Sequence, residues 1–139
     1  MKKIALFTLI VLGSYGCFAC DCKESRNDSI GIVEAYEQSD VVTVARVSEI
    51  ILHEDTNKIS NYRTVKMIIQ RAYKGVQKRD TITVTAYIGG PSCGVELNEG
   101  VVYLLYAYNH SKLGITTDSC TRTTIFTSTV YDTVILDNF

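Results

Sequence analysis

The stretch TITVTAYI at residues 81–88 decides the fold class of this chain, because polar and apolar side chains alternate strictly along it. Successive side chains of a β-strand point to opposite faces, so a period of two predicts a strand with one buried and one exposed face. Gly89, Gly90 and Pro91 follow it and predict a loop. The chain is therefore expected to be mainly β.

Two more strands are expected before this stretch. Residues 41–51 are rich in β-branched side chains and predict a long strand that ends in the polar stretch 53–57. Residues 65–73 place apolar side chains at alternate positions, which predicts the next strand. Lys74 and Gly75 predict the turn that follows it.

Two helices are expected, one at each end of the strand region. Residues 29–38 predict a short helix, because suitable side chains recur at helical spacing. Its inner face would comprise Ile30, Val33 and Tyr36 or Glu37, with Asp28 or Ser29 capping the first turn. Residues 128–139 predict a second helix in which Val130, Val134 and Ile135 share a face, although β-branched residues weaken helices.

Two strands are expected after the loop at residues 89–91. Asn98-Glu99-Gly100 predicts a turn into an apolar strand at residues 101–108, and a fifth strand is expected near residues 115–119. Five short strands with one or two helices fit the five-stranded Greek-key barrel called the OB-fold.

The first residues have the pattern of a secretory signal peptide. Lys2 and Lys3 precede an apolar run at residues 4–12, and Cys17-Phe18-Ala19 favours cleavage before Cys20. The apolar run is far shorter than the about 20 residues that a membrane-spanning helix needs, so no membrane span is expected. The expected organisation is a signal peptide at residues 1–19 and one domain at residues 20–139, secreted or periplasmic. The alternative is a lipoprotein anchored at Cys17.

Net charge and chain length limit which functions are expected. Removing the signal peptide takes away Lys2 and Lys3 but no acidic residue, so the formal charge goes from −1 to −3. Proteins that bind nucleic acid present basic surfaces, so a nucleic-acid partner is not expected. The remaining length suits one domain, which we expect to be a monomer.

Cysteine usage predicts two disulfides. Cleavage before Cys20 leaves four cysteines, Cys20, Cys22, Cys93 and Cys120, in a compartment where thiols are usually paired. A bridge between Cys20 and Cys22 would close a strained ring, so each is expected to pair with Cys93 or Cys120, in either combination. The alternative is a four-thiolate zinc site, but the paired C-x-x-C spacing of such sites is missing.

No catalytic site is indicated. His53 lies beside Glu54 and Asp55 in what is expected to be a polar hairpin tip, and His110 is expected in a turn. With every mature cysteine paired, a Cys/His nucleophilic pair is excluded, and a Ser/His/Asp triad has no supporting motif. The chain is therefore not expected to be an enzyme or to need a cofactor.

The framework resembles the netrin-like domain of the tissue inhibitors of metalloproteinases. Those inhibitors begin with Cys-x-Cys after signal-peptide cleavage, as Cys20-Asp21-Cys22 would here. Cys93 lies 73 residues after Cys20, and Cys120 lies 98 residues after Cys22, which is similar to the family spacing. Other familiar positions are Ser39-Asp40-Val41-Val42 with Ala45 and Val47, Cys93-Gly94, and Gly100 with Tyr103-Leu104. The resemblance implies disulfides Cys20–Cys93 and Cys22–Cys120.

The resemblance also implies a mechanism. The free α-amine and carbonyl of Cys20 would chelate the catalytic zinc of a metalloproteinase, the expected partner, with nitrogen as a ligand that zinc accepts. The inhibitory ridge would comprise Cys20, Asp21, Cys22, Ser92, Cys93 and Gly94. The family places a small or hydroxylated side chain where Asp21 stands, so a target with a basic or shallow pocket is expected. The alternative function is a non-inhibitory exported or lipid-anchored OB-fold binding or envelope module.

Overall fold

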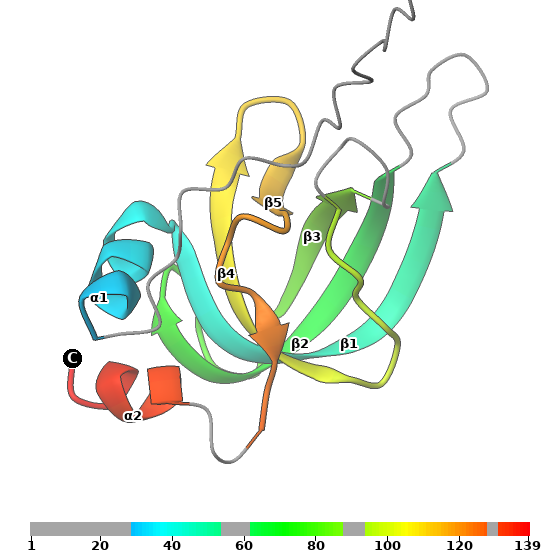
Figure 1. Ribbon diagram of the computed structural model, residues 1–139. Helices are drawn as coiled ribbons and strands as arrows, with labels where there is room; N and C mark the ends of the chain where they lie inside the picture. The colour runs from blue at the N-terminus through cyan, green and yellow to red at the C-terminus, as the bar shows by residue number, and fades with distance from the viewer. Residues whose placement is uncertain (1–28, 54–61, 88–93, 128–130) are drawn as a thin grey trace, which may run out of the picture.

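The computed structural model describes residues 29–53, 62–87, 94–127 and 131–139, which form two short helices and six strands (Figure 1). The helices are α1, Ser29–Gln38, and α2, Tyr131–Leu136. The strands are β1 (Val41–His53), β2 (Tyr62–Lys74), β3 (Thr81–Tyr87), β4 (Val102–His110), β5 (Gly114–Thr117) and β6 (Thr124–Ile125). The prediction of a mainly β protein is confirmed.

Five of these strands close into a barrel. Hydrogen-bonded neighbours follow the order β1-β2-β3-β5-β4, and pairing of β4 with β1 completes the circle. The neighbours are antiparallel except for β3 and β5, where Thr85 lies opposite Thr116 in a parallel pair. This closed mixed barrel is OB-fold-like. The short strand β6 was not predicted, and it pairs with the first half of β4.

The first strand closes the barrel because it pairs along both edges. Residues 41–46 of β1 pair with β4, and nearly the whole strand pairs with β2. The β1–β2 register shifts at three places, between Val42 and Thr43, between Val44 and Ala45, and between Val47 and Glu49. Such irregularities bend and twist a strand, and Figure 1 shows β1 as a long curved ribbon.

Two apolar cores lie on the two sides of the barrel wall. The inner core fills the barrel and comprises Val41, Ala45, Val47, Val65, Met67, Ile69, Val84, Ala86, Leu97, Tyr103, Leu105 and Ala107. The outer core lies between the barrel and the helices and comprises Ile32, Val42, Val44, Leu104, Tyr106 and Leu136. Because both faces of β1 are covered near its start, residues 41–45 are buried without a break.

The helix α1 has the predicted bounds, but its buried face is different. Ile32 is fully buried, and Ala35 and Tyr36 pack against the outer core beside it. Val33 is half-buried, and of the alternatives Tyr36 and Glu37 it is Tyr36 that contacts the core, since Glu37 is exposed; the burial of Ile32 was not predicted. The helix turns Ile32 inward because its neighbours there are Val42, Leu104 and α2, which sequence spacing alone does not specify.

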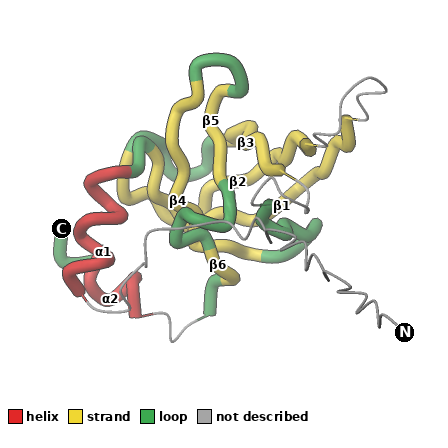
Figure 2. Tube along the Cα trace, turned by 45° about the horizontal axis from the view of Figure 1, so that its top comes forward, coloured by secondary structure: helices red, strands yellow, loops and turns green. Residues whose placement is uncertain are grey.

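The helix α2 is shorter than predicted and also presents another face. Val134, expected to share a face with Ile135, is 60% exposed, whereas Ile135 packs partly against the outer core. Asp132, Thr133 and Leu136 are buried. A buried ion pair holds Asp132 inward, and Leu136 packs into the outer core on the same side. Both helices lie next to each other on one side of the barrel (Figure 2).

The turn expected at Lys74 and Gly75 is confirmed, since β2 ends at Lys74 and Gly75 follows. Gly75 has a φ of 73°, which favours glycine, and a Cβ there would collide with the backbone carbonyl of Asp40. This close approach places the end of β2 beside the start of β1.

The remaining strands agree with the predictions to within a few residues. The period-two stretch became β3, with Val84 and Ala86 buried and Thr81 and Thr83 exposed. Thr85 is buried as well, because its hydroxyl donates to the carbonyl of Leu113 at 2.9 Å and β5 lies alongside. None of the helices formed by the described residues is long and apolar enough to cross a membrane.

Candidate functional site

Most of the predicted inhibitory ridge lies outside the described residues. This is true of Cys20, Asp21, Cys22, Ser92 and Cys93, and only Gly94 falls within them. The structure therefore neither brings the ridge together nor separates it. What it describes is the surroundings of two framework positions, Gly94 and Cys120.

Residues 94–98, here called the Gly94 segment, are held against the barrel near their C-terminal end. The side chain of Leu97 is fully buried in the inner core. The Tyr103 hydroxyl accepts a hydrogen bond from the Asn98 N–H at 2.9 Å and donates one to the Glu96 carbonyl at 3.3 Å. The Arg63 Nη1 donates to the Leu97 carbonyl at 3.1 Å. Three consecutive residues of the segment thus have a backbone contact to a barrel side chain.

A tight turn follows the Gly94 segment, as predicted. The Val101 N–H donates to the Asn98 carbonyl at 3.2 Å, and Gly100 has a φ of 81°, which favours glycine. The Gly100 N–H donates to the Val47 carbonyl, and the Val47 N–H donates to the Val101 carbonyl. The turn is therefore joined to β1 before β4 begins.

Cys120 lies in an exposed turn between β5 and β6. It is the one cysteine among the described residues. The pairings Cys20–Cys93 and Cys22–Cys120 stay predictions.

A carboxylate organises the turn that carries Cys120. Asp118 Oδ1 accepts hydrogen bonds from the backbone N–H groups of Cys120 and Thr121, at 2.8 and 3.1 Å. The Tyr108 hydroxyl, on β4, donates to Asp118 Oδ2 at 2.8 Å. Because the carboxylate binds both the turn and the barrel, it places Cys120 at a defined position beside β4.

Threonine hydroxyls fix the chain after that turn. Thr123 accepts a hydrogen bond from the Tyr106 N–H at 3.0 Å and donates to the Tyr106 carbonyl at 2.9 Å. The hydroxyl of Thr117 lies 2.8 Å from that of Thr123 and 2.9 Å from that of Thr121. The Thr123 side chain thus bonds both backbone polar groups of the buried Tyr106, a role that a neighbouring strand fills elsewhere in the sheet.

A buried polar cluster lies between β4 and α2. Arg122 donates to Asp132 twice, from Nη2 to Oδ1 at 2.7 Å and from Nε to Oδ2 at 2.9 Å, and the Tyr106 hydroxyl donates to Oδ2 at 2.9 Å. Burial raises the pKa of the Tyr106 hydroxyl far above its ordinary value, and the charge of Asp132 adds to this rise. The hydrogen bond to Asp132 raises the pKa of Arg122. Tyr106 and Arg122 therefore keep their protons at neutral pH, and the cluster serves to hold α2.

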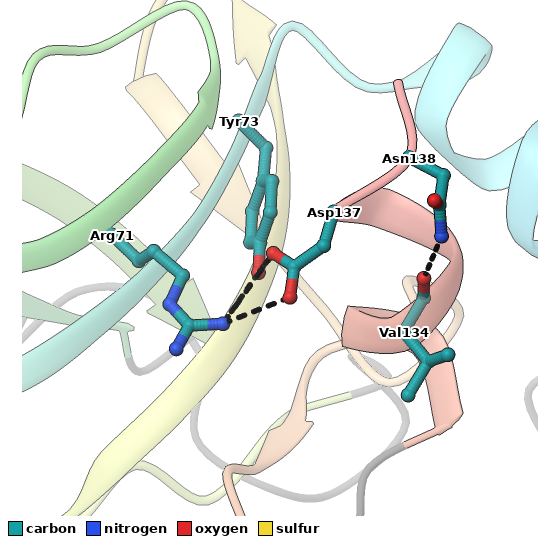
Figure 3. Close-up of polar contacts among 5 residues, drawn as sticks. All are labelled: Arg71, Tyr73, Val134, Asp137 and Asn138. Atoms are coloured by element: carbon teal, nitrogen blue, oxygen red, sulfur yellow. Dashed lines mark hydrogen bonds and ion pairs between the residues drawn. The ribbon is translucent and has the colours of Figure 1, made fainter.

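A second cluster of the same residue types lies on the surface at the other end of α2 (Figure 3). Asp137 accepts hydrogen bonds from Arg71 Nη1 at 3.3 Å and from the Tyr73 hydroxyl at 2.9 Å. The hydrogen bond with Tyr73 raises the pKa of Arg71, and partial burial raises the pKa of Tyr73. Sequence patterns did not indicate either cluster, because each aspartate lies 10 to 66 residues from its partners.

The two histidines, His53 and His110, are the weaker candidates for a functional site. His53 is the last residue of β1, and Glu54 and Asp55 lie outside the described residues. His110, expected in a turn, is the last residue of β4, and its Nδ1 accepts a hydrogen bond from the Lys112 N–H at 3.2 Å. Within the described part of the chain, no group of three or more His, Cys, Asp or Glu side chains could hold a metal ion.

Comparison with models of known protein families and with curated protein sequences gave no match to this chain.

Proposed function

We propose that the chain is an exported inhibitor of a zinc metalloproteinase, similar to the tissue inhibitors of metalloproteinases. The free α-amine and carbonyl of Cys20 would chelate the catalytic zinc and displace its water. The signal peptide would be removed before Cys20, and disulfides Cys20–Cys93 and Cys22–Cys120 would bind the first residues to the barrel.

The observation that carries this proposal is the combination of a Cys-x-Cys pair, its two distant cysteines and an OB-fold-like barrel. The strand order β1-β2-β3-β5-β4 with β4 against β1 gives the closed, OB-fold-like barrel on which the proposal draws. The netrin-like assignment goes beyond that order and belongs to the proposal. Support also comes from the turn that carries Cys120, which Asp118 holds against β4.

The surroundings of Gly94 support it further, because inhibition by a few residues requires them to be held rigidly. Ordering a flexible segment on binding reduces affinity. The Gly94 segment is held by Arg63, Tyr103 and the buried Leu97, so little freedom is left three to five residues after Cys93.

The residue Asp21 sets the expected target. It would point toward the pocket of the protease that selects the side chain after the cleaved bond. Burying an unpaired carboxylate in an apolar pocket is costly, so we expect inhibition of proteases with a basic or shallow pocket. Asp21→Thr should extend inhibition to proteases with deep apolar pockets.

The test is an inhibition assay with mature protein that begins at Cys20. We expect inhibition of at least one member of a panel of zinc proteases with basic, shallow and deep apolar pockets. Adding one alanine before Cys20, or acetylating its amine, should abolish that inhibition, while circular dichroism of the barrel stays unchanged. Equal inhibition by the extended form would contradict zinc chelation.

Asp21 itself favours a second candidate, a non-inhibitory exported or lipid-anchored binding module. Mass spectrometry of the unreduced exported protein separates the two. A free Cys20 amine with the two proposed disulfides agrees with the inhibitor. A lipidated Cys17, a blocked Cys20 or another pairing agrees with the binding module.

A further inference from the structure

An arginine occupies a position in β2 where the strand pattern calls for an apolar residue. Val65, Met67 and Ile69 are buried at alternate positions of β2, and Arg63 belongs to the same alternate set. Its side chain therefore leaves the strand toward the barrel interior. Opposite it on β3 is Ala86, which is fully buried and small enough to leave room for a long side chain.

The contacts of this guanidinium are incomplete. Nη1 donates to the Leu97 carbonyl at 3.1 Å. Nε is buried and has no hydrogen-bond partner among the residues that the structure describes. A buried donor without an acceptor destabilises the fold, and methionine would fill the same space without that cost. Packing therefore does not explain an arginine here, whereas its bond to Leu97 does.

We infer that Arg63 is a positioning residue that, together with Tyr103, holds the Gly94 segment for binding. The two side chains come from different strands, β2 and β4, and contact the backbone of consecutive residues, Leu97 from one side and Glu96 and Asn98 from the other. This inference rests on the proposed function, because the Gly94 segment supports the inhibitory ridge only if that ridge exists. On this inference, Arg63 lowers the stability of the fold but fixes a segment that binds.

The experiment measures amide exchange by NMR in the mature protein and in Arg63→Met. We expect the amide of Asn98 and its neighbours in the Gly94 segment to exchange about tenfold faster, since a charge-assisted hydrogen bond to this segment is lost. The amide of Ile69, in the barrel and bonded to Asp80, should be unaffected, and the melting temperature should be unchanged or higher.

Three further variants sharpen the test. Tyr103→Phe removes only the hydroxyl, and it should loosen the same segment. Arg63→Lys keeps a charged donor and should restore part of the protection. Arg46→Met removes an exposed arginine from β1 and should change nothing in the segment.

Two exchange results would overturn the inference. One is unchanged exchange in the Gly94 segment of Arg63→Met, and the other is faster exchange throughout the barrel, which would make Arg63 a residue of general stability.

Inhibition assays on the same variants separate this inference from the proposed function. Arg63→Met should weaken inhibition about tenfold by making the segment less ordered before binding. Loosening of the segment with unchanged inhibition would overturn its link to the ridge. If the wild-type protein inhibits no protease, the proposed function fails, and the exchange result still decides whether Arg63 positions the segment.

Discussion

The two ends of α2 are attached to the barrel by clusters of the same three residue types, one buried and one exposed. Near its start, Asp132 pairs with Arg122 and Tyr106, and the charged side chains are 9% and 11% exposed. Just after its end, Asp137 pairs with Arg71 and Tyr73, with both charged side chains about half exposed. The same chemical groups should therefore contribute differently to the free energy of unfolding, because their access to water differs.

The difference has a physical cause. In the buried cluster both carboxylate oxygens accept charge-assisted bonds of 2.7 to 2.9 Å, and water cannot replace a lost partner. In the exposed cluster water and salt screen the ions, and the closest approach of Arg71 Nη1 to the carboxylate is 3.3 Å. We therefore expect the buried cluster to fix α2, whereas the exposed one adds little.

Removing the buried carboxylate should have the largest effect. Asp132→Asn leaves the Arg122 charge buried without its counter-ion, so we expect a loss of about 3–5 kcal/mol in the free energy of unfolding. Urea denaturation at neutral pH measures this. A loss below that of Asp137→Asn would show that burial does not separate the two clusters.

Removing the Tyr106 hydroxyl should have an intermediate effect that depends on pH. Tyr106→Phe takes one donor from Asp132, and we expect a loss of about 1–3 kcal/mol in the free energy of unfolding at neutral pH. Folding raises the pKa of Tyr106 above its ordinary value of 10.0, so the folded state holds this proton when the unfolded state releases it.

The stability that this hydroxyl contributes is therefore fully present below about pH 10 and is lost as the pH rises above it, by about 1.4 kcal/mol per pH unit. Urea titrations at a series of alkaline pH values measure the difference between the wild-type protein and Tyr106→Phe. That difference should shrink as the pH rises. A constant difference would contradict the raised pKa.

Removing the exposed carboxylate should have the smallest effect. Asp137→Asn is expected to cost at most about 1 kcal/mol in the free energy of unfolding, because surface ion pairs contribute little. Raising the salt concentration should remove most of that cost, whereas the cost of Asp132→Asn should persist. A large effect of Asp137→Asn that salt does not change would mean that this cluster is more constrained than its exposure indicates.

The candidate site was predicted from the spacing of four cysteines, and most of its residues lie outside the described part of the chain. Spacing singled out Gly94 and Cys120 as framework positions, but it did not indicate the side chains that hold their surroundings. Arg63 precedes the strand predicted at residues 65–73, and Asp118 falls within the strand predicted near residues 115–119, so the sequence indicated neither as a residue that holds a segment. Their roles depend on partners 34 residues away, at Leu97, and 10 residues away, at Tyr108.

Features that depend on local geometry could be predicted from the amino-acid sequence alone. The alternation in residues 81–88, the β-branched run at 41–51, the turns at Gly75 and Gly100 and the bounds of α1 follow from side-chain period and backbone freedom within a few residues. Such features need no knowledge of distant parts of the chain.

Which surfaces meet depends instead on contacts between distant parts of the chain. The parallel pairing of β3 with β5, the added strand β6 and the inward faces of α1 and α2 all depend on residues that are far apart in the chain. The face of α2 shows the reason most clearly. Hydrophobicity alone would turn Val134 inward, but the bonds from Arg122 and Tyr106 hold Asp132 there instead, since a paired charge can be buried and an unpaired one cannot.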